Sequence, residues 1–458
     1  MSGWVSKQPS RQSHSSHHGH HDSYSADSLY GHLGHLSEAQ EHAFARFKEL
    51  CSNEKLYSPG QGEQPSSHDD ATMIRFLRAR RFEPHAAFEQ FKETEIWRKE
   101  NKLQELYDNI DVETYEEARK MYPQWVGRRD KRGIPVYVYT IRHLTSKNVS
   151  AWQKSAAPPT ALHKDSKVPP TLLHLFALYE NLLRFVFPLC TYMTDRPNLE
   201  SPITATANIV DISGVGLKQF WNLKGHMQAA STLATAHYPE TLDRIFVCNP
   251  AISLDALTLA NLMQIIGAPS FFPTVWGWVK RWFDPGTTSK IFILGQHEVA
   301  STLTSLIEPE NVPKCFGGTL DWEWGDYPNL GENEKKVVGG VQEKAGAAKW
   351  LKGPLEWRDE DKVTGEPTKT VAVGTVGGKL RREDVAIAER MHPAGEKEVF
   401  SEKQAERTAT VNGGNIETNE VSDLDDKADS GKSLDGVAPP EEKEQIGTVA
   451  PIATVLAT

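Results

Sequence analysis

The stretch between residues 134 and 307 alternates short runs of β-branched and aromatic residues with longer helical runs. The short runs predict strands at Ile134–Ile141, Ile203–Ile212, Arg244–Cys248 and Lys290–Leu294. The longer runs predict helices at 172–193, Leu217–His237 and about 296–307. Because strands that alternate with helices pair in parallel, we expect an α/β lobe with a largely parallel sheet.

A group of helices precedes this lobe. Ser37 is a typical residue for the start of a helix, and the charges of Asp69–Asp70 suit the start of a second one. Pro84 fits the first turn of a third helix. We therefore expect a small all-helical N-terminal lobe at 37–115, followed by the α/β lobe at 116–328, with an exposed loop at 145–171.

Both ends of the chain are predicted to be disordered. Residues 1–36 are rich in His and Ser, which indicates a solvated arm or, alternatively, a metal-binding tract. Residues 401–458 carry 12 Asp/Glu against 5 Lys/Arg and no aromatic residue, so they contribute most of the net charge of -10. Such a composition buries too little apolar surface to fold. We expect 329–458 to be a mostly disordered acidic tail, in which Trp350 and Trp357 could pin a short segment to the lobe.

Several classes of protein are disfavoured by what the sequence lacks. The four cysteines form no CxxC pair, the N-terminus has no apolar signal segment, and apolar stretches such as Leu182–Cys190 fall short of a membrane span. Without the acidic tail the chain is nearly neutral, which argues against nucleic acid as a partner. No GxSxG, HExxH or complete P-loop motif is present, so we expect a cytoplasmic protein that is not an enzyme and binds no metal.

Residues 271–295 contain an unusually aromatic helix at about 273–283. Its only charges are Lys280 and Arg281, and its apolar residues point in nearly every direction. Those residues include Val275, Trp276, Trp278, Val279, Trp282 and Phe283. Tryptophans beside cations suit a membrane interface, while an ordinary core helix is the alternative.

Five motifs occur in the order found in one known family. They are Arg75–Phe82 (RFLRARRF), Ile209–Gly214 (IVDISG), Tyr238–Glu240 (YPE), Ser289–Gly295 (SKIFILG) and Pro309–Gly318 (PENVPKCFGG). Over about 37–325 the chain resembles the CRAL-TRIO lipid-binding family, and within it the fungal Sec-fourteen-like phosphatidylinositol transfer branch. The resemblance implies an α/β lobe whose sheet floors an apolar lipid pocket, closed by a mobile gate helix that Val275–Phe283 matches.

The resemblance also implies a site for the lipid headgroup. Its residues are Arg80, Arg81, Glu240, Thr287 and Lys290. Cations and hydroxyl groups suit a phosphodiester, and an ion pair with Glu240 would keep Lys290 from being an isolated charge. The alternatives are that Arg80 and Arg81 form a solvated helix face and that Lys290 is a surface strand residue.

A second lipid site is less well supported. The branch handles phosphatidylcholine through two hydroxyl residues on the strand before IVD, where this chain has Thr206 and Asn208. Phosphatidylcholine is therefore an open second ligand. The resemblance implies a monomer that needs no cofactor beyond its bound phospholipid, exchanges or presents phosphatidylinositol, and associates transiently with Golgi, endosomal or ER membranes. The alternatives are a carrier of another hydrophobe (a sterol, a tocopherol-like lipid or haem) and an unrecognised lipid hydrolase.

Residues 247–264 interrupt the family pattern. Arg244–Phe246 would join Ile265–Pro269 smoothly without them, in agreement with the family. The segment begins with Val, whose codons start with GT, and ends with Gln, which CAG encodes. We therefore hypothesise a translated, unspliced intron. The alternative is a true gate insertion, because Leu259, Leu262 and Met263 have helical spacing.

Overall fold

The computed structural model describes residues 29–61, 64–155, 160, 163–164, 166–215, 217–248, 288–338, 352–361 and 366–386. The predicted gate helix, Thr287 and the histidine-rich residues 1–28 lie outside these ranges, as do residues 387–458. All described residues belong to one structural unit.

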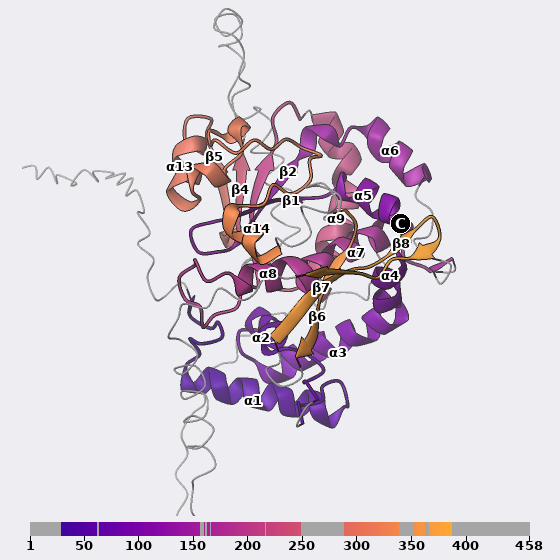
Figure 1. The fold of residues 1–458 in the computed structure, drawn as a ribbon, viewed down its shortest axis with the longest axis vertical. Coiled ribbons are helices and arrows are strands. Elements are labelled where there is room, and N and C mark those ends of the chain that lie inside the picture. The colour runs from indigo at the N-terminus through magenta and orange to yellow at the C-terminus, as the bar shows by residue number, and fades with distance from the viewer. Residues whose placement is uncertain are drawn as a thin grey trace, which may run out of the picture. The chain divides into compact units, whose positions relative to one another are not determined.

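Three helices form the core of the N-terminal lobe (Figure 1): α1 (Glu38–Asn53), α2 (Asp70–Ala79) and α3 (Pro84–Glu100). The helices α4 (Leu103–Asn109) and α5 (Val112–Arg119) follow and contact α7 (Pro170–Asn181) of the α/β lobe. Ser37 and Gln40 form a capping box at the start of α1. The Asp69 side chain accepts a hydrogen bond from the Thr72 backbone N–H at the start of α2, and Pro84 occupies the first turn of α3. The three predicted helix starts are therefore confirmed.

The segment before α1 is part of the fold. Leu33 and Leu36 pack against the core of the N-terminal lobe. The Leu33 carbonyl accepts a hydrogen bond of 2.7 Å from the Ser201 hydroxyl, which belongs to the α/β lobe. The prediction of a disordered arm over 1–36 is therefore wrong for residues 29–36, because long-range contacts that local composition does not reveal hold them.

The α/β lobe is built on a five-stranded sheet in the order β1-β2-β3-β4-β5. Its strands are β1 (Gln124–Arg129), β2 (Pro135–Thr140), β3 (Thr206–Asp211), β4 (Leu242–Cys248) and β5 (Ile291–Leu294). Only β1 and β2 pair antiparallel, and the other neighbours are parallel. The predicted, largely parallel sheet is confirmed, while β1 has no counterpart among the predicted strands.

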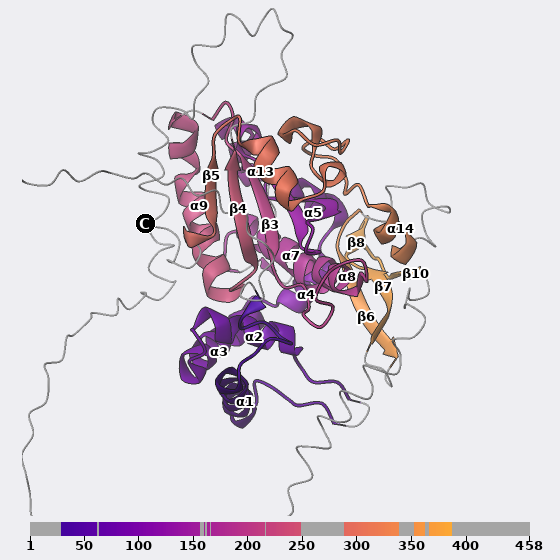
Figure 2. The ribbon, with the colours of Figure 1, turned by 90° about the vertical axis from the view of Figure 1, so that its left-hand side faces the viewer.

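Helices cover both faces of this sheet (Figure 2). On one face, Ile209 and Phe246 pack against Leu303 of α13 (Val299–Leu306). On the other, Val210 packs with Leu223 of α9 (Leu217–His237). Residues that alternate along β3 therefore bury opposite faces, as the pleat requires.

Two stretches differ from expectation. The predicted loop at 145–171 contains α6 (Ser146–Ser155), which buries Trp152. The helices α7 (Pro170–Asn181), η4 (a π-helical turn, Leu182–Val186) and α8 (Phe187–Tyr192) run on as one stretch of 23 residues. That stretch is long and apolar enough to cross a membrane, contrary to the prediction from its parts, but 67% of its most apolar window is buried. We therefore interpret it as a core helix.

Folded structure continues beyond residue 328. The helix α14 (Glu332–Val338) is followed by strands β6 (Leu355–Asp361), β7 (Glu366–Ala372), β8 (Thr375–Val376), β9 (Lys379–Leu380) and β10 (Glu383–Ala386). A second sheet has the order β10-β7-β6. The Trp357 indole donates a 2.7 Å hydrogen bond to the Phe185 carbonyl, as a pinning residue would. A mostly disordered 329–458 is therefore wrong for these strands.

Only two residues of the 247–264 segment are described. Val247 and Cys248 complete β4 and pair with Ile293 and Leu294 of β5. Without the segment, Ile265 and Ile266 would follow Phe246 directly and supply β-branched residues at the same two places. The sheet therefore accommodates either reading of the segment.

Candidate functional site

Three charged side chains meet just before the N-terminal ends of β4 and β5. Nζ of Lys290 lies 3.1 Å from Oε2 of Glu240, and Nη2 of Arg78 lies 3.3 Å from the same oxygen. We call Arg78, Glu240 and Lys290 the charged cluster. Their side chains are 18% to 24% exposed, so they are partly desolvated yet reachable by a ligand. The predicted ion pair between Glu240 and Lys290 is confirmed.

The charged cluster has two cations facing one carboxylate. The nearby carboxylate of Asp243 is bound by both terminal nitrogens of Arg132, which also binds Asp130. Arg244 lies 3.8 Å from Asp243. Burial lowers the pKa of Arg78, and the carboxylates of Glu240 and Asp243 oppose that effect. Since Arg132 and Arg244 balance Asp130 and Asp243, one positive charge of the cluster is left over.

The turn that carries Glu240 is tied down at each residue. Glu240 has φ of 56°, in the left-handed region that a non-glycine residue adopts only when its surroundings impose it. The Pro239 carbonyl accepts a hydrogen bond of 3.4 Å from Arg75 of α2. The Thr241 hydroxyl donates to the Tyr238 carbonyl at 3.0 Å. These contacts hold the backbone of the turn, while the ion pairs with Arg78 and Lys290 hold the carboxylate of Glu240.

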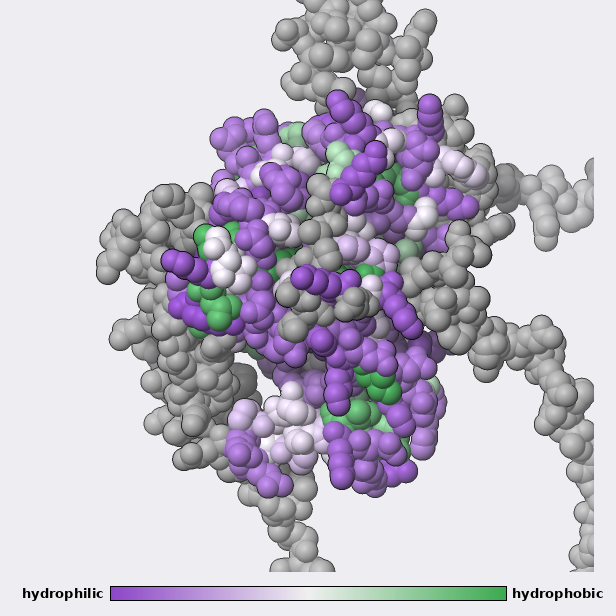
Figure 3. Space-filling view, turned by 90° about the vertical axis from the view of Figure 1, so that its right-hand side faces the viewer, coloured by the Kyte–Doolittle hydropathy of each residue, from purple (hydrophilic) through white to green (hydrophobic). Residues whose placement is uncertain are grey.

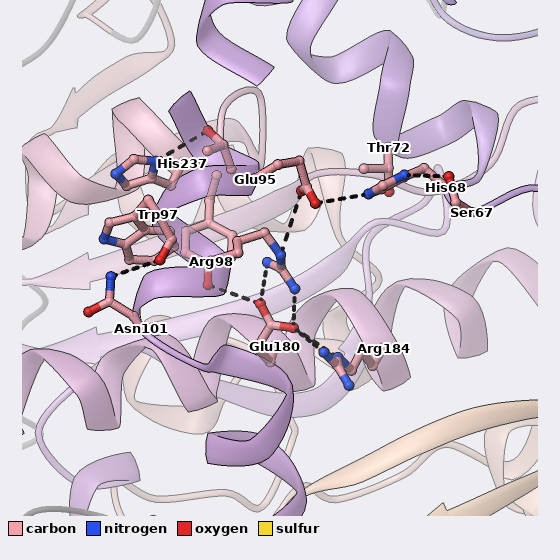
Figure 4. Close-up of polar contacts among 12 residues, drawn as sticks. Ser67, His68, Thr72, Glu95, Trp97, Arg98, Asn101, Glu180, Arg184 and His237 are labelled. Atoms are coloured by element: carbon pink, nitrogen blue, oxygen red, sulfur yellow. Dashed lines mark hydrogen bonds and ion pairs between the residues drawn. The ribbon is translucent and has the colours of Figure 1, made fainter. Parts of the chain in front are cut away.

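A buried ion network of Arg98, Glu180 and Arg184 is hydrogen-bonded to the same turn, and Figure 4 shows the two arginines directed at the Glu180 carboxylate. The Glu180 carboxylate, 1% exposed, accepts two hydrogen bonds from Arg98 at 2.7 and 2.9 Å and one from Arg184 at 2.8 Å. The Tyr238 hydroxyl donates a fourth at 3.0 Å. Burial alone would raise the pKa of Glu180, but the two arginines outweigh it and lower the pKa to about 2. Helices α3 and α7 are thereby tied to the turn 238–241.

Sequence reasoning missed this network, although the sequence holds one signal for it. Glu180 is the single acidic residue within the apolar run 172–193, and a carboxylate in such a run needs a buried partner. Arg98 follows Trp97, whose ring stacks on His237 with centroids 4.0 Å apart. Burial, with a smaller effect of Arg98, lowers the pKa of His237 to about 4, so this ring is neutral at pH 7.

Arg80 and Arg81 are not brought to the charged cluster. Helix α2 ends at Ala79, and Arg81 has φ of 52°, so both residues follow the end of the helix. Both are exposed, and neither makes an ion pair within the described ranges. Arg78 takes that place because it lies one helical turn after Arg75 and shares its face.

The two residues proposed for a second lipid are on β3 and buried. The Thr206 hydroxyl donates to the Thr241 carbonyl at 3.1 Å, and the Asn208 amide donates to the Thr206 hydroxyl oxygen at 2.7 Å. These bonds link β3 to the turn 238–241. The hydroxyl hydrogen of Thr206 is therefore committed to the protein.

One small pocket lies beside β1 and β2. Trp125, Tyr137 and Phe185 line it together with Gln124, whose amide nitrogen is buried and makes no hydrogen bond. Its volume is about 60 Å³. A dry cavity that admits benzene measures roughly 150 Å³, so this pocket has room for water but not for a phospholipid. The large apolar pocket expected over the sheet remains a prediction.

The membrane-binding surface also remains a prediction. Val275, Trp276, Val279, Trp282 and Phe283 lie outside the described residues, as does Thr287. On the face shown in Figure 3, exposed apolar residues form small separate patches in a hydrophilic surface, which is ordinary for a soluble protein. On the edge strand β5, Phe292 and Ile293 are 43% and 44% exposed and follow the charged cluster directly.

Comparison with known proteins finds one family. A sequence model of the CRAL/TRIO domain matches residues 119–260 and 257–318, and one of the CRAL/TRIO N-terminal domain matches residues 43–93. The match to the CRAL/TRIO domain is in two parts, and the boundary between them lies inside the segment 247–264.

Curated relatives agree. The SEC14 cytosolic factor of Kluyveromyces lactis is 30% identical over 61% of this chain and 78% of its own. The SEC14 cytosolic factor of Eremothecium gossypii is 28% identical, and the match covers 55% of this chain and 70% of that protein. A phosphatidylinositol/phosphatidylcholine transfer protein of Arabidopsis thaliana, SFH9, is 30% identical, and the match covers 56% of this chain and 38% of that protein. The crystal structure of Sfh5, with a TM-score of 0.43 and 14% identity over 65% of this chain and 92% of its own, is too distant to add to this.

Proposed function

The chain belongs to the CRAL-TRIO family, and we propose that it binds phosphatidylinositol in an apolar pocket and exchanges or presents it at membranes. The names of the relatives, SEC14 cytosolic factor and phosphatidylinositol/phosphatidylcholine transfer protein, support phospholipid binding and transfer as the general function. The name cytosolic factor also supports a cytosolic location, and we propose that the protein visits membranes transiently. The choice of phosphatidylinositol rests on the charged cluster.

The charge of the cluster matches that of a phosphodiester. Arg78 and Lys290 carry one positive charge more than Glu240 neutralises, and a phosphodiester carries one negative charge. Both cations can donate hydrogen bonds to phosphate oxygens. The Glu240 carboxylate can accept hydrogen bonds from inositol hydroxyls. This balance of one surplus cation with one accepting carboxylate is the observation that carries the proposal.

A carrier is needed because a two-chain lipid leaves a bilayer very slowly. Each buried CH₂ group contributes about 0.8 kcal/mol to its retention. The carrier must offer an apolar pocket of similar free energy and open it only at the membrane. Such exchange changes no covalent bond, so we propose no enzymatic reaction.

An uncharged ligand fits the cluster less well. A sterol or a tocopherol-like lipid bound by apolar contact would leave the surplus cation without an anion. Haem carries two propionate carboxylates, but it offers no hydroxyl group to Glu240. Phosphatidylcholine shares the phosphodiester but offers no hydroxyls to Glu240, and the Thr206 hydroxyl already donates to Thr241. We therefore propose phosphatidylinositol as the principal ligand and phosphatidylcholine as a second one.

Mass spectrometry of lipids that co-purify with the full-length protein tests the ligand class. We expect phosphatidylinositol to be enriched over its share of the host membranes. Enrichment of a sterol or another neutral hydrophobe, with no inositol lipid, would refute the proposal. Hydrolysis of phosphatidylinositol that is added to the purified protein would instead indicate a hydrolase.

Replacing Lys290 with Ala tests the cluster. Glu240 keeps its ion pair with Arg78, so the fold should persist. A hydrogen bond to a charged group is worth about 1.5–3 kcal/mol, so phosphatidylinositol transfer should fall about tenfold to a hundredfold. Lys314→Ala is the matched control, because Lys314 is 62% exposed and, among the described residues, forms its ion pair with the surface residue Asp321 alone. Equal loss of transfer in both variants would contradict the assignment.

A further inference from the structure

The segment 29–36 spans the two lobes and packs against Phe82, in the turn that follows α2, the helix that carries Arg78. It makes two turns, closed by hydrogen bonds from the His32 N–H to the Leu29 carbonyl and from the His35 N–H to the His32 carbonyl, both 2.9 Å. On one side, Leu33 and Leu36 pack against the N-terminal lobe. His32 is the central residue of the two turns, and we call residues 29–36 the N-terminal strap.

The other side of the strap is fixed to the α/β lobe. The Leu33 carbonyl accepts a 2.7 Å hydrogen bond from Ser201, and His35 Nε2 lies 2.9 Å from a carboxylate oxygen of Glu200. Gly31 has φ of 78°, and a Cβ there would lie 3.0 Å from the ring of Phe82, in the turn that ends α2. The backbone of His32 is therefore held between two anchored neighbours.

The imidazole of His32 lies within electrostatic reach of the charged cluster. Burial is the main cause that lowers its pKa to about 3, and the charges of Arg78, Lys290 and His35 lower it further. The opposing charge is that of Asp243 on β4. Of these groups, Arg78 lies on α2, Asp243 on β4, Lys290 just before β5 and His35 on the strap itself. At pH 7 the ring is neutral, with one nitrogen that donates and one that accepts.

We propose that His32 is a headgroup-binding residue and that the N-terminal strap forms the outer wall of the inositol phosphate site. This inference rests on the proposed function and adds to it a residue that the family motifs do not contain. A neutral ring beside two cations adds a donor for a phosphate oxygen, or an acceptor for an inositol hydroxyl, without adding to the surplus charge. The wall thereby favours headgroups with hydroxyls over a choline headgroup, which has none.

The test compares variants of the full-length protein loaded from vesicles that contain equal amounts of phosphatidylinositol and phosphatidylcholine. His32→Leu should lower the ratio of bound phosphatidylinositol to bound phosphatidylcholine about fivefold or more. His32→Gln, which keeps a donor and an acceptor, should restore at least half of the wild-type ratio. His42→Leu is the control, because its side chain is 81% exposed on α1. An unchanged ratio in His32→Leu, or equal loss of both lipids, overturns the proposal.

A second measurement decides the matter if His32→Leu does not fold. The wild-type protein, with ¹³C-labelled histidine, is titrated with phosphatidylinositol and separately with soluble inositol 1-phosphate. The resonance absent from His32→Gln should shift with the lipid. No shift overturns the proposal, and a shift with inositol 1-phosphate alone overturns a lipid site. Absence of phosphatidylinositol binding by the wild type would instead refute the proposed function itself.

Discussion

Replacing Glu180 with Gln keeps the shape of the side chain and removes the charge that Arg98 and Arg184 bind. The pKa of Glu180 is lowered from its ordinary 4.5 to about 2, a difference of about 2.5. At about 1.36 kcal/mol for each pKa unit, this corresponds to roughly 3 kcal/mol of stability at pH 7. The side chain is 1% exposed, so solvent screens it little. Breaking a buried ion pair costs about 3–5 kcal/mol, the same range, so we expect Glu180→Gln to lower the free energy of unfolding by about 3 kcal/mol.

The pH dependence gives this prediction a second test. Because the pKa of Glu180 is lower in the folded state, its stabilisation is complete well above pH 4.5 and is lost as the pH falls through about 2. The difference between wild type and Glu180→Gln should narrow to roughly 1 kcal/mol at pH 3.

Urea unfolding followed by tryptophan fluorescence measures this difference at each pH. Glu95→Gln is the control, because Glu95 lies 3.8 Å from Arg98 and its side chain is 24% exposed. That variant should lose less than about 1 kcal/mol. A difference for Glu180→Gln that is below about 1 kcal/mol at pH 7, or that does not change with pH, would refute the reasoning.

Three further predictions concern segments that lie wholly or mostly outside the described ranges. Replacing Trp276 and Trp282 with Ser should weaken co-sedimentation with liposomes more than it reduces retained lipid, since interfacial rings anchor to membranes; loss of folded protein at unchanged sedimentation would make both residues core. Deleting 401–458 should leave lipid transfer in vitro nearly unchanged, because an acidic tail without aromatics adds little to a pocket; a large drop at matched concentration contradicts this. If 247–264 is a retained intron, sequencing the mature transcript should show messages without it; persistence of the whole segment in the dominant message rules the intron out.

Features set by neighbouring residues could be predicted from the sequence. The caps at Ser37 and Asp69 and the proline at Pro84 act within one turn of their helices. Strand β1 was missed because its sequence, QWVGRR, looks polar. Its Arg129 is stabilised by Asp195 and by Glu334, far along the chain. No local sequence pattern predicts ion-pair partners that lie so far along the chain.

In the candidate site, too, one feature could be predicted from the sequence and another could not. The ion pair of Glu240 with Lys290 followed from a family motif and is present. Arg78, which pairs with the same carboxylate, was not among the predicted residues, because RFLRARRF does not say where the helix ends. The structure ends α2 at Ala79, so Arg78 faces the α/β lobe and the two residues predicted for the headgroup, Arg80 and Arg81, do not. Their role in headgroup binding stays a prediction.

The second sheet extends the folded part of this protein beyond the domain that the family model covers. The family match ends at residue 318, yet the Phe185 carbonyl receives its hydrogen bond from Trp357, and Glu116 accepts one of 2.7 Å from the Gly353 N–H. A chain cut at the family boundary would leave both acceptors without these donors. In evolutionary terms, Gly353 and Trp357, which supply these donors, should therefore accept few substitutions, although the stretch that carries them has the composition of a linker.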